Sequence, residues 1–424
     1  MDNRLKREKI ADGAYFSAVT DPRFKFNQIT FSFFVPLDEE KASLYALVPR
    51  YLSTANAEIP VAKDFINYLA SLYNAKIDSE AWGIGDTQYL SVSLTFMDDS
   101  YALHGEKITE AASKVLFDCI FHPNNYDKAF YAPDVEINKR QQIEAIEAEL
   151  NDKRVYAANQ AKRLICEGEP AAVNPQGTVE RTREITPESV YNAHYDLLNT
   201  AGIEIICVGC NDFSDALRIA KEKFAAIKME YRKPVPYSTA CSPLKSEVAE
   251  KTEKLPLLNQ SKMVLGFKTD SKNRPALTLM SNLYGGTLSS KLFLNVRERL
   301  SLCYYCWSRV NREKGLMTVS CGVEEANIEK AKAEILAQLE LVKSGDFTDD
   351  DLRNALLYEQ NDTKTMNDSP NSLAAWYIIR IYIGDIKSPE EALADFNAVT
   401  REALIEAANS INLDTFYVLS GGDE

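Results

Sequence analysis

The sequence predicts an α+β protein built from two similar, duplicated domains, each with a mainly antiparallel sheet and helices packed on one face. Three observations lead to this fold class. Alternating apolar strands recur in both halves, amphipathic helices follow them, and each half ends in a capped helix and a strand. The spacing between matching features falls steadily, from 232 residues between Phe31 and Met263 to 214 residues between Thr186 and Thr400. Loop shortening in the second copy produces such a drift, whereas chance matches would scatter.

The strands of each half show the period of two that a sheet with one buried face requires. The first strand of each half carries apolar side chains at alternate positions: Ile29, Phe31, Phe33 and Val35, then Met263, Leu265 and Phe267. A second alternating strand follows in each half, at residues 90–96 and 317–323. The matching order of strands supports the duplication.

The helices of each half also correspond. Apolar stripes at helical spacing predict long helices over residues 108–120 and 328–342. Each half then closes with a helix whose N-cap is a threonine, Thr186 or Thr400, and with a terminal strand. We therefore expect domains at residues 1–225 and 259–424, joined by a polar, proline-bearing linker at 226–258.

Composition narrows the classes of function. The chain has 424 residues, 45% of them hydrophobic and 26% charged, as in soluble globular proteins. No apolar run approaches the roughly 20 residues that span a bilayer, and the N-terminus lacks the apolar core of a secretion signal, so we expect a cytoplasmic protein. A net charge of −14 argues against binding to nucleic acid or anionic membranes. Eight cysteines in apolar segments suit a reduced interior.

Local metal and nucleophile motifs are absent from the sequence. The three histidines lie too far apart for a zinc pair and are expected to be structural: His104, His122 and His194. Two C-x-x-C pairs occur, Cys207 with Cys210 and Cys303 with Cys306. Both pairs lie in apolar, strand-like context, and their separation is far from the 15–20 residues of a zinc ribbon, so we assign them no metal.

The segment GGTLSSKLFLNVRERLSLCYY, residues 285–305, resembles the second-domain signature of the insulinase/pitrilysin zinc peptidases. The matching positions are Gly285, Gly286, Ser289, Ser290, Leu292, Phe293, Val296, Arg297, Glu298, Leu302 and Tyr304. The duplication, the domain size and the order of strands and helices are similar to that family over nearly the whole chain. The resemblance implies a molecule arranged as half of a clamshell.

The first domain departs from the family at the metal. The family carries H-x-x-E-H on the helix after the first strand, where two histidines bind zinc and the glutamate activates water. The equivalent helix here is KASLYALVPRYLSTA, and the best alignment places on the motif Ala46, Leu47, Val48, Pro49 and Arg50. Residues 1–103 contain no histidine, and a cation at Arg50 would repel zinc. The chain resembles a zinc-lacking branch of the family, and we expect no metal on it.

The resemblance assigns the remaining chemistry to Arg297 and Tyr304, seven residues apart. In related two-subunit peptidases these side chains reach the zinc site of another subunit and hold the substrate backbone and the reacting carbonyl. The chain is then a pseudoenzyme, inactive alone, that contributes both residues in trans to a zinc-bearing subunit of a heterodimeric endopeptidase. Extended peptide would bind by strand addition to a sheet edge.

Other interpretations remain open at this point. The chain can be a catalytically inert peptide-binding or structural homologue, alone or as a homodimer. It can also be an enzyme with an unusual metal site built from His122, His194 or the cysteine pairs. At the signature itself, Arg297 can pair with Glu298 or another acid while Tyr304 packs in the core. The substrate, the partner and the pathway do not follow from the sequence.

Overall fold

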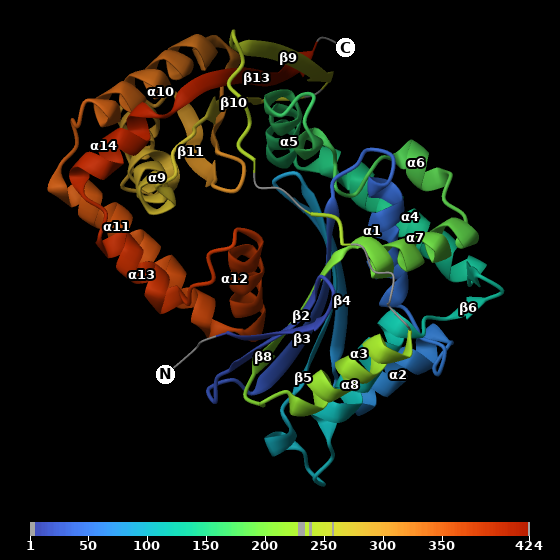
Figure 1. Cartoon of the computed structure of the whole chain (residues 1–424). Coiled ribbons are helices and arrows are strands. Elements are labelled where there is room, and N and C mark those ends of the chain that lie inside the picture. The colour runs from blue at the N-terminus through green and yellow to red at the C-terminus, as the bar shows by residue number, and fades with distance from the viewer. Residues whose placement is uncertain (1–4, 228–233, 237–239, 257, 423–424) are drawn as a thin grey trace. The chain divides into compact units, whose positions relative to one another are not determined.

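The computed structural model describes residues 5–227, 234–236, 240–256 and 258–422 (Figure 1). The chain forms two compact units, and each contains one large sheet. The first unit comprises Met1–Glu147, Val173–Ser238 and Thr365–Ser388, and the second comprises Ala148–Ala172, Thr239–Lys364 and Pro389–Glu424. Each unit therefore takes one segment from the other half of the sequence.

The sheet of the first unit has six strands. In spatial order they are β1 (Lys6–Ala11), β2 (Ala14–Thr20), β8 (Gly202–Gly209), β3 (Phe26–Pro36), β5 (Thr87–Met97) and β4 (Lys76–Ile84). Neighbouring strands are antiparallel except β2 and β8, which are parallel. A short hairpin of β6 (Asn125–Tyr126) and β7 (Ala129–Phe130) lies outside this sheet.

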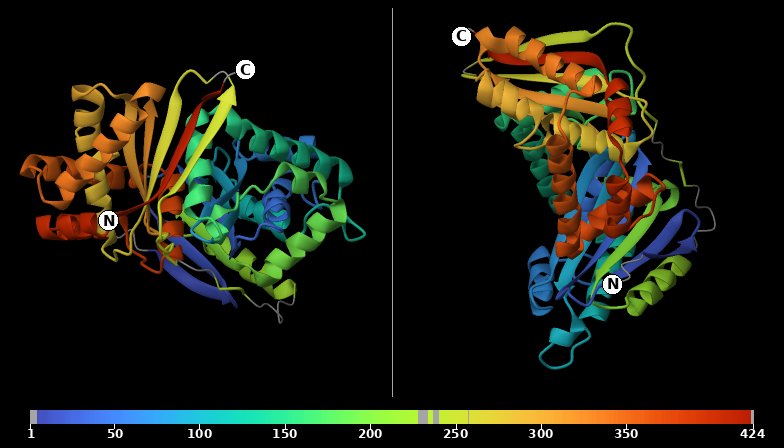
Figure 2. Two further views of the ribbon diagram at one scale, coloured as in Figure 1. Left: turned by 90° about the horizontal axis from the view of Figure 1, so that it is seen from above. Right: turned by 90° about the vertical axis from the view of Figure 1, so that its left-hand side faces the viewer.

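The sheet of the second unit repeats this topology without a counterpart of β1. Its order is β9 (Ala249–Pro256), β13 (Asn412–Gly422), β10 (Ser261–Lys268), β12 (Leu316–Val323) and β11 (Cys303–Asn311). Again one pair is parallel, β9 with β13, and the others are antiparallel. The further views in Figure 2 show the red strand β13 between yellow neighbours. The predicted α+β class with two similar, mainly antiparallel sheets is confirmed.

Helices of the first unit form the main core with one face of its sheet. They are α1 (Ala42–Leu52), α2 (Ala62–Ser71), α3 (Ile108–Phe121), α4 (Ala132–Ala148), α6 (Val179–Arg183), α7 (Pro187–Thr200) and α8 (Ser214–Ala226). Phe31 and Phe33 of β3 are buried against Leu47 of α1 and Leu116 of α3. Thr186 caps α7, as its sequence predicts, and Ser189 completes a reciprocal capping box.

The second unit contains α9 (Arg274–Ser281), α10 (Ile328–Lys343), α11 (Asp349–Thr365), α13 (Pro389–Asn397) and α14 (Arg401–Asn409). The Thr400 hydroxyl accepts from the Ala403 N–H and begins α14, again as predicted. Short 3₁₀ turns complete the two units: η1 (Asp99–Tyr101), η2 (Glu149–Asn151), η3 (Pro170–Ala172), η6 (Glu325–Asn327) and η7 (Met366–Asp368). No helix in the described ranges is both long and apolar enough to cross a membrane.

A single exchanged helix covers the opposite face of each sheet (Figure 1). Helix α5 (Lys153–Ile165) comes from the first half of the sequence, but its Ala157 and Ala161 pack on Val264 and Tyr417 of the second sheet. Helix α12 (Pro370–Tyr382) comes from the second half and covers the first sheet. Its contacts there are Leu373, Tyr377 and Ile378 with Phe34, Ile206 and Val208. The prediction of helices on one face of each sheet therefore holds only for the larger helical layer of each unit.

Two features hold α5 against the second sheet. At Gly266 a Cβ atom would lie 2.5 Å from Ile165 Cδ1, so the absence of a side chain allows the close approach. Just after α5, the Glu169 carboxylate lies 2.7 Å from Lys314 Nζ and accepts from the Ser242 hydroxyl at 2.9 Å. These contacts assign residues 148–172 to the second unit. The predicted boundaries at 225 and 258 concern the sequence repeat and remain a prediction.

Candidate functional site

The segment that carries Arg297 and Tyr304 folds as two π-helical stretches followed by an edge strand. The stretches are η4 (Asn282–Gly286) and η5 (Leu292–Arg299), and the strand is β11. Wide π turns are rare and are frequent at functional sites, because the extra residue in each turn re-aims the side chains that follow. Arg297 lies near the end of η5, and Tyr304 is the second residue of β11.

Several members of the signature build the framework of this segment. A Cβ atom at Gly285 would lie 2.7 Å from both Leu292 Cδ1 and the Ser308 backbone nitrogen, so only glycine fits between η5 and β11. Leu292 and Val296 are fully buried, and the buried Ser290 hydroxyl accepts from the Phe293 N–H at 3.4 Å at the start of η5. These four residues are therefore explained by packing alone, without a ligand.

A tight reversal separates Arg297 from Tyr304. The Leu300 N–H donates to the Asn295 carbonyl and the Leu302 N–H to the Val296 carbonyl, both at 3.1 Å. Between them Ser301 has φ of +50°, in the left-handed region that non-glycine residues rarely occupy. The reversal ends η5 and starts β11 within three residues, which brings both predicted site residues to the same corner of the second unit.

Arg297 is open to a ligand. Its side chain is 39% exposed, with Nη1 3.5 Å from Glu298 Oε1. The guanidinium carbon lies 4.6 Å from the centroid of the Phe293 ring, which supports the planar group from one side. An exposed ion pair contributes only about 0–1 kcal/mol, so Glu298 does not prevent the guanidinium from binding a carboxylate or a carbonyl. The pair with Glu298 that the sequence left open is therefore present but weak.

Tyr304 is exposed rather than packed in the core. Its side chain is 57% exposed, and its hydroxyl donates to Glu324 Oε1 at 3.0 Å. This hydrogen bond and the negative charge of Glu324 raise the pKa of Tyr304, so the phenol remains a proton donor. Both residues lie in the described part of the chain, and no hydrogen bond joins them there. Instead, Arg297 pairs with Glu298 and Tyr304 donates to Glu324.

The helix that aligns with the zinc motif is filled by core residues. Ala46, Leu47 and Val48 are fully buried in α1, and Pro49 lies inside the same helix. Arg50 is half-buried, its Nη2 lies 3.4 Å from Gln176 Oε1, and desolvation lowers its pKa. None of these side chains is a metal ligand, because three are aliphatic, one is proline and one is a cation.

The histidines have structural surroundings. His194 on α7 is buried, its Nε2 lies 2.7 Å from the Ile120 carbonyl, and burial lowers its pKa to about 4. His122 ends α3 near Asp118 and Lys223, while His104 lies in the loop before α3. Among the described residues, the three histidines belong to no cluster of potential metal ligands.

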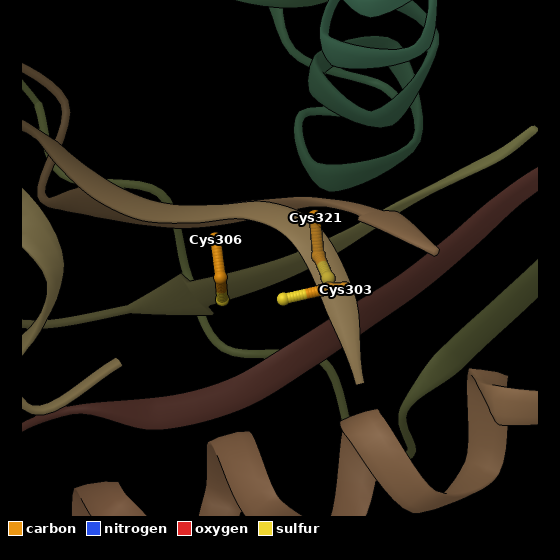
Figure 3. Close-up of side chains that lie close together, drawn as sticks. All are labelled: Cys303, Cys306 and Cys321. Atoms are coloured by element: carbon orange, nitrogen blue, oxygen red, sulfur yellow. The ribbon is translucent and has the colours of Figure 1, made fainter. Parts of the chain in front are cut away.

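Three cysteines come together beside Tyr304. The sulfur atoms of Cys303, Cys306 and Cys321 all lie within 4.8 Å of one another, and the three residues are buried (Figure 3). In a regular strand, residues three apart point to opposite faces. Here an irregularity between Cys303 and Tyr305 shifts the register, so both cysteines of the C-x-x-C pair point to one face. Cys321 lies directly opposite Cys306 on β12.

The pKa values of the three thiols shift in different directions. Hydrogen bonds from Cys306 and Cys321 lower the pKa of Cys303, against the effect of burial, and Arg297 adds to this lowering. The same hydrogen bonds, with burial, raise the pKa of Cys306 and of Cys321. The hydrogen bonds between the three thiols and the charge of Arg297 therefore favour the thiolate form of Cys303.

Sequence reasoning found the C-x-x-C pair but missed its third member. A signal was available: the turn at residues 312–315 joins two alternating strands, and counting back from it in register places Cys321 opposite Cys306. The bulge at Tyr304 had no such signal. The other pair stays apart from this cluster, with Cys207 buried and Cys210 half-buried at the end of β8.

The chain is similar in sequence and in fold to several known proteins. Residues 184–357 match the family profile described as "Peptidase M16 inactive domain". A Bacillus subtilis protein described as "probable inactive metalloprotease YmfF" is 26% identical over 409 residues, 95% of each chain. A solved structure of a conserved protein from Enterococcus faecalis V583 superposes with a TM-score of 0.88 at 22% identity, covering 99% of both chains. A Helicobacter pylori protease gives a TM-score of 0.80 at 13% identity over 99% of both chains.

Proposed function

Because the chain is a homologue of the inactive insulinase-type metallopeptidases, we propose that it is the non-catalytic subunit of a heterodimeric zinc endopeptidase. In this proposal it contributes Arg297 and Tyr304 in trans to a zinc-bearing partner. One observation carries the proposal: in a signature whose Gly285, Ser290, Leu292 and Val296 are buried framework, the side chains of Arg297 and Tyr304 remain accessible to solvent. Side chains needed only for packing would not be presented in this way.

The chemistry of the two side chains suits a peptide. The planar fork of Arg297 can donate two parallel hydrogen bonds to a peptide carbonyl or a C-terminal carboxylate. The protonated hydroxyl of Tyr304 can donate to the oxyanion that develops on the reacting carbonyl. Zinc on the partner would activate the attacking water. The present chain would orient the substrate and stabilise negative charge.

The edge strand beside Tyr304 supports binding of an extended peptide. Among the described strands, β11 pairs with β12 alone, and it therefore forms an edge of the sheet. Trp307 on the same strand is exposed, and its ring stacks on Tyr305 with centroids 4.9 Å apart. An added strand would gain main-chain hydrogen bonds that depend little on the sequence of the peptide. This mode fits a peptidase subunit with a broad range of substrates.

The test begins with an affinity purification of the tagged chain from its own host, read by mass spectrometry. An insulinase-type protein bearing H-x-x-E-H should be recovered, and the mixture of the two chains should hydrolyse peptides that neither hydrolyses alone. A second copy of this chain supplies no zinc motif, so a homodimer should be inert.

We expect Arg297→Ala to lower turnover of the reconstituted complex by roughly 10²–10³-fold, because a charge-stabilising donor is lost. Arg299→Ala is the matched control, since Arg299 lies on the same helix, is exposed and pairs with Glu334 at 3.8 Å. Tyr304→Phe should lower turnover as well. Unchanged turnover of Arg297→Ala in a complex that still assembles would contradict the proposed role.

The alternative is an inert peptide-binding or structural homologue. The acid partners favour it, because in the free chain Arg297 already forms an ion pair with Glu298 and Tyr304 already donates to Glu324. In that case the complex would bind peptides without hydrolysing them, and Arg297→Ala would weaken peptide affinity alone. Isothermal titration with an uncleaved peptide distinguishes the two functions.

A further inference from the structure

The cysteine cluster on the β11–β12 hairpin has no part in the proposed function. We propose that Cys303, Cys306 and Cys321 form a buried three-thiolate site for a soft monovalent metal ion, cuprous copper. The site lies on the bulge that carries Tyr304, but it needs neither a peptide nor a partner subunit. The proposal therefore stands or falls independently of the peptidase role.

The geometry is close to that of a bound ion. A metal bound to thiolates at about 2.3 Å holds three of them about 4 Å apart. The three sulfur atoms already lie within 4.8 Å of one another without an ion, so closure requires shifts of roughly 1 Å or less. All three residues lie on paired strands, two of them directly opposite, and the backbone therefore pre-organises the ligands.

The number of ligands selects the kind of ion. Among the described residues, the cluster of potential ligands contains these three cysteines and no histidine or carboxylate. Structural zinc sites are almost always tetrahedral and use four protein ligands. Burial of the three cysteines also limits access of water as a fourth ligand. Thiolates are soft ligands that favour cuprous copper, and three sulfur atoms satisfy its low coordination number.

The charges around the cluster favour an anionic complex. Three thiolates and one monovalent cation leave a net charge of about −2, which is costly to bury without compensation. Two cations act on the cluster: Arg297 on Cys303, and Lys262 on Cys321. Lys262 is buried on β10, in register with Gly322 and next to the cysteine strand. The site thus offers both the ligands and the counter-charge.

The main competing state is a disulfide. Cys306 and Cys321 are cross-strand neighbours, and oxidation would join them and remove two of the three ligands. The cysteines here are free thiols, so the cluster is in the form that binds metal. The experiment must distinguish the two states.

The full-length chain is purified under anaerobic, reducing conditions and titrated with Cu(I) as its acetonitrile complex against a chromophoric Cu(I) chelator. We expect one equivalent of copper per chain, a thiolate-to-copper charge-transfer absorption, and three sulfur neighbours at about 2.3 Å by X-ray absorption. Zn²⁺ is titrated in parallel with a zinc chelator. Cu(I) should compete successfully where Zn²⁺ does not.

Variants locate the site. Cys303→Ser and Cys321→Ser should each abolish stoichiometric binding, while Cys207→Ser, a buried cysteine outside the cluster, should leave it unchanged. Lys262→Met removes no ligand and should weaken binding by roughly 10-fold through the lost charge. Circular dichroism verifies that each variant is folded.

Three outcomes would overturn the proposal. They are binding that is unaffected in the folded cluster variants, preference for Zn²⁺ over Cu(I), and a Cys306–Cys321 disulfide that persists in the reduced preparation.

Discussion

At the scale of single residues, His194 links the stability of the first unit to pH. Burial lowers its pKa to about 4, whereas an unfolded chain gives histidine about 6.5. Between these values the unfolded state binds more protons than the folded state, so stability rises with pH across this window. As pH falls from about 6.5 to about 4, we expect a loss of up to about 3 kcal/mol from this residue.

Urea denaturation at a series of pH values measures this loss. His194→Gln retains a donor near the Ile120 carbonyl but does not titrate, so its stability should change less between pH 6.5 and pH 4 than that of the unmodified chain. Carboxylates titrate in both proteins, and the comparison removes their contribution. Parallel pH curves for the two proteins would show that His194 is not the group responsible.

The Glu324 carboxylate influences the pKa of Tyr304, the predicted oxyanion donor. Its hydrogen bond and charge raise the pKa of Tyr304, so removing the charge should bring that pKa back toward its ordinary value. We expect Glu324→Gln to lower the pKa of Tyr304, measured by NMR of ring-labelled tyrosine with Tyr304→Phe to assign the signal. Glu325→Gln is the neighbouring control and should leave the titration of Tyr304 unchanged.

Single residues also mark where sequence reasoning ends. The resemblance identified Arg297 and Tyr304 by their spacing, but their exposure depends on the π-helical end of η5 and on Ser301 in the left-handed region. No short-range pattern predicts either feature, because both result from the packing of η5 against β11. The position of Cys321 opposite Cys306 could be counted from the hairpin turn, but the bulge that turns Cys303 to the same face has no local sequence signal.

At the scale of elements, Gly266 determines how closely α5 approaches the second sheet. A Cβ atom there would lie 2.5 Å from Ile165 Cδ1, which the packed interface cannot absorb without moving the helix. We expect Gly266→Ala to destabilise the second unit by about 1–3 kcal/mol through overpacking. Chemical denaturation measures the change, and limited proteolysis within residues 148–172 reports on the release of α5.

A second substitution makes this test specific. Ile165→Ala removes both clashing atoms, Cγ1 and Cδ1, and alone should cost about 2–5 kcal/mol. In the double variant the two costs should not add, because the shorter side chain leaves room for the new methyl group. Additive losses would show that Gly266 is required for another reason, such as the irregular pairing of β10 with β13 beside it.

The elements that were predicted correctly are those with one buried face and a clear period. Strands β3, β5, β10 and β12 and the capped helices α7 and α14 follow directly from alternation and from threonine caps. Strand β9 was instead assigned to the linker, because its sequence AEKTEKLP is that of an exposed, charged segment. Its strand conformation comes from parallel pairing with β13, a long-range contact that local composition does not encode.

At the scale of the whole molecule, the exchange of helices makes each unit depend on both halves of the sequence. Periodicity shows that α5 and α12 have apolar faces, but it cannot show which sheet each one covers. The repeat was therefore detected, while the exchange of residues 148–172 and 365–388 was not. Duplication of a sequence and separation into compact units are different properties, and here they divide the chain differently.

This dependence predicts how fragments behave. A fragment of residues 1–236 lacks α12, so Phe34, Ile206 and Val208 lose the apolar cover that Leu373, Tyr377 and Ile378 provide. We expect this fragment alone to bind a hydrophobic dye and to unfold without a cooperative transition, because one face of its sheet is exposed. A synthetic peptide of residues 365–388 should reduce dye binding and restore the transition, whereas the same peptide with Leu373→Asp should not. Cooperative unfolding of the fragment without the peptide would mean that the larger layer of helices is sufficient, and that α12 serves a purpose other than completing the first unit.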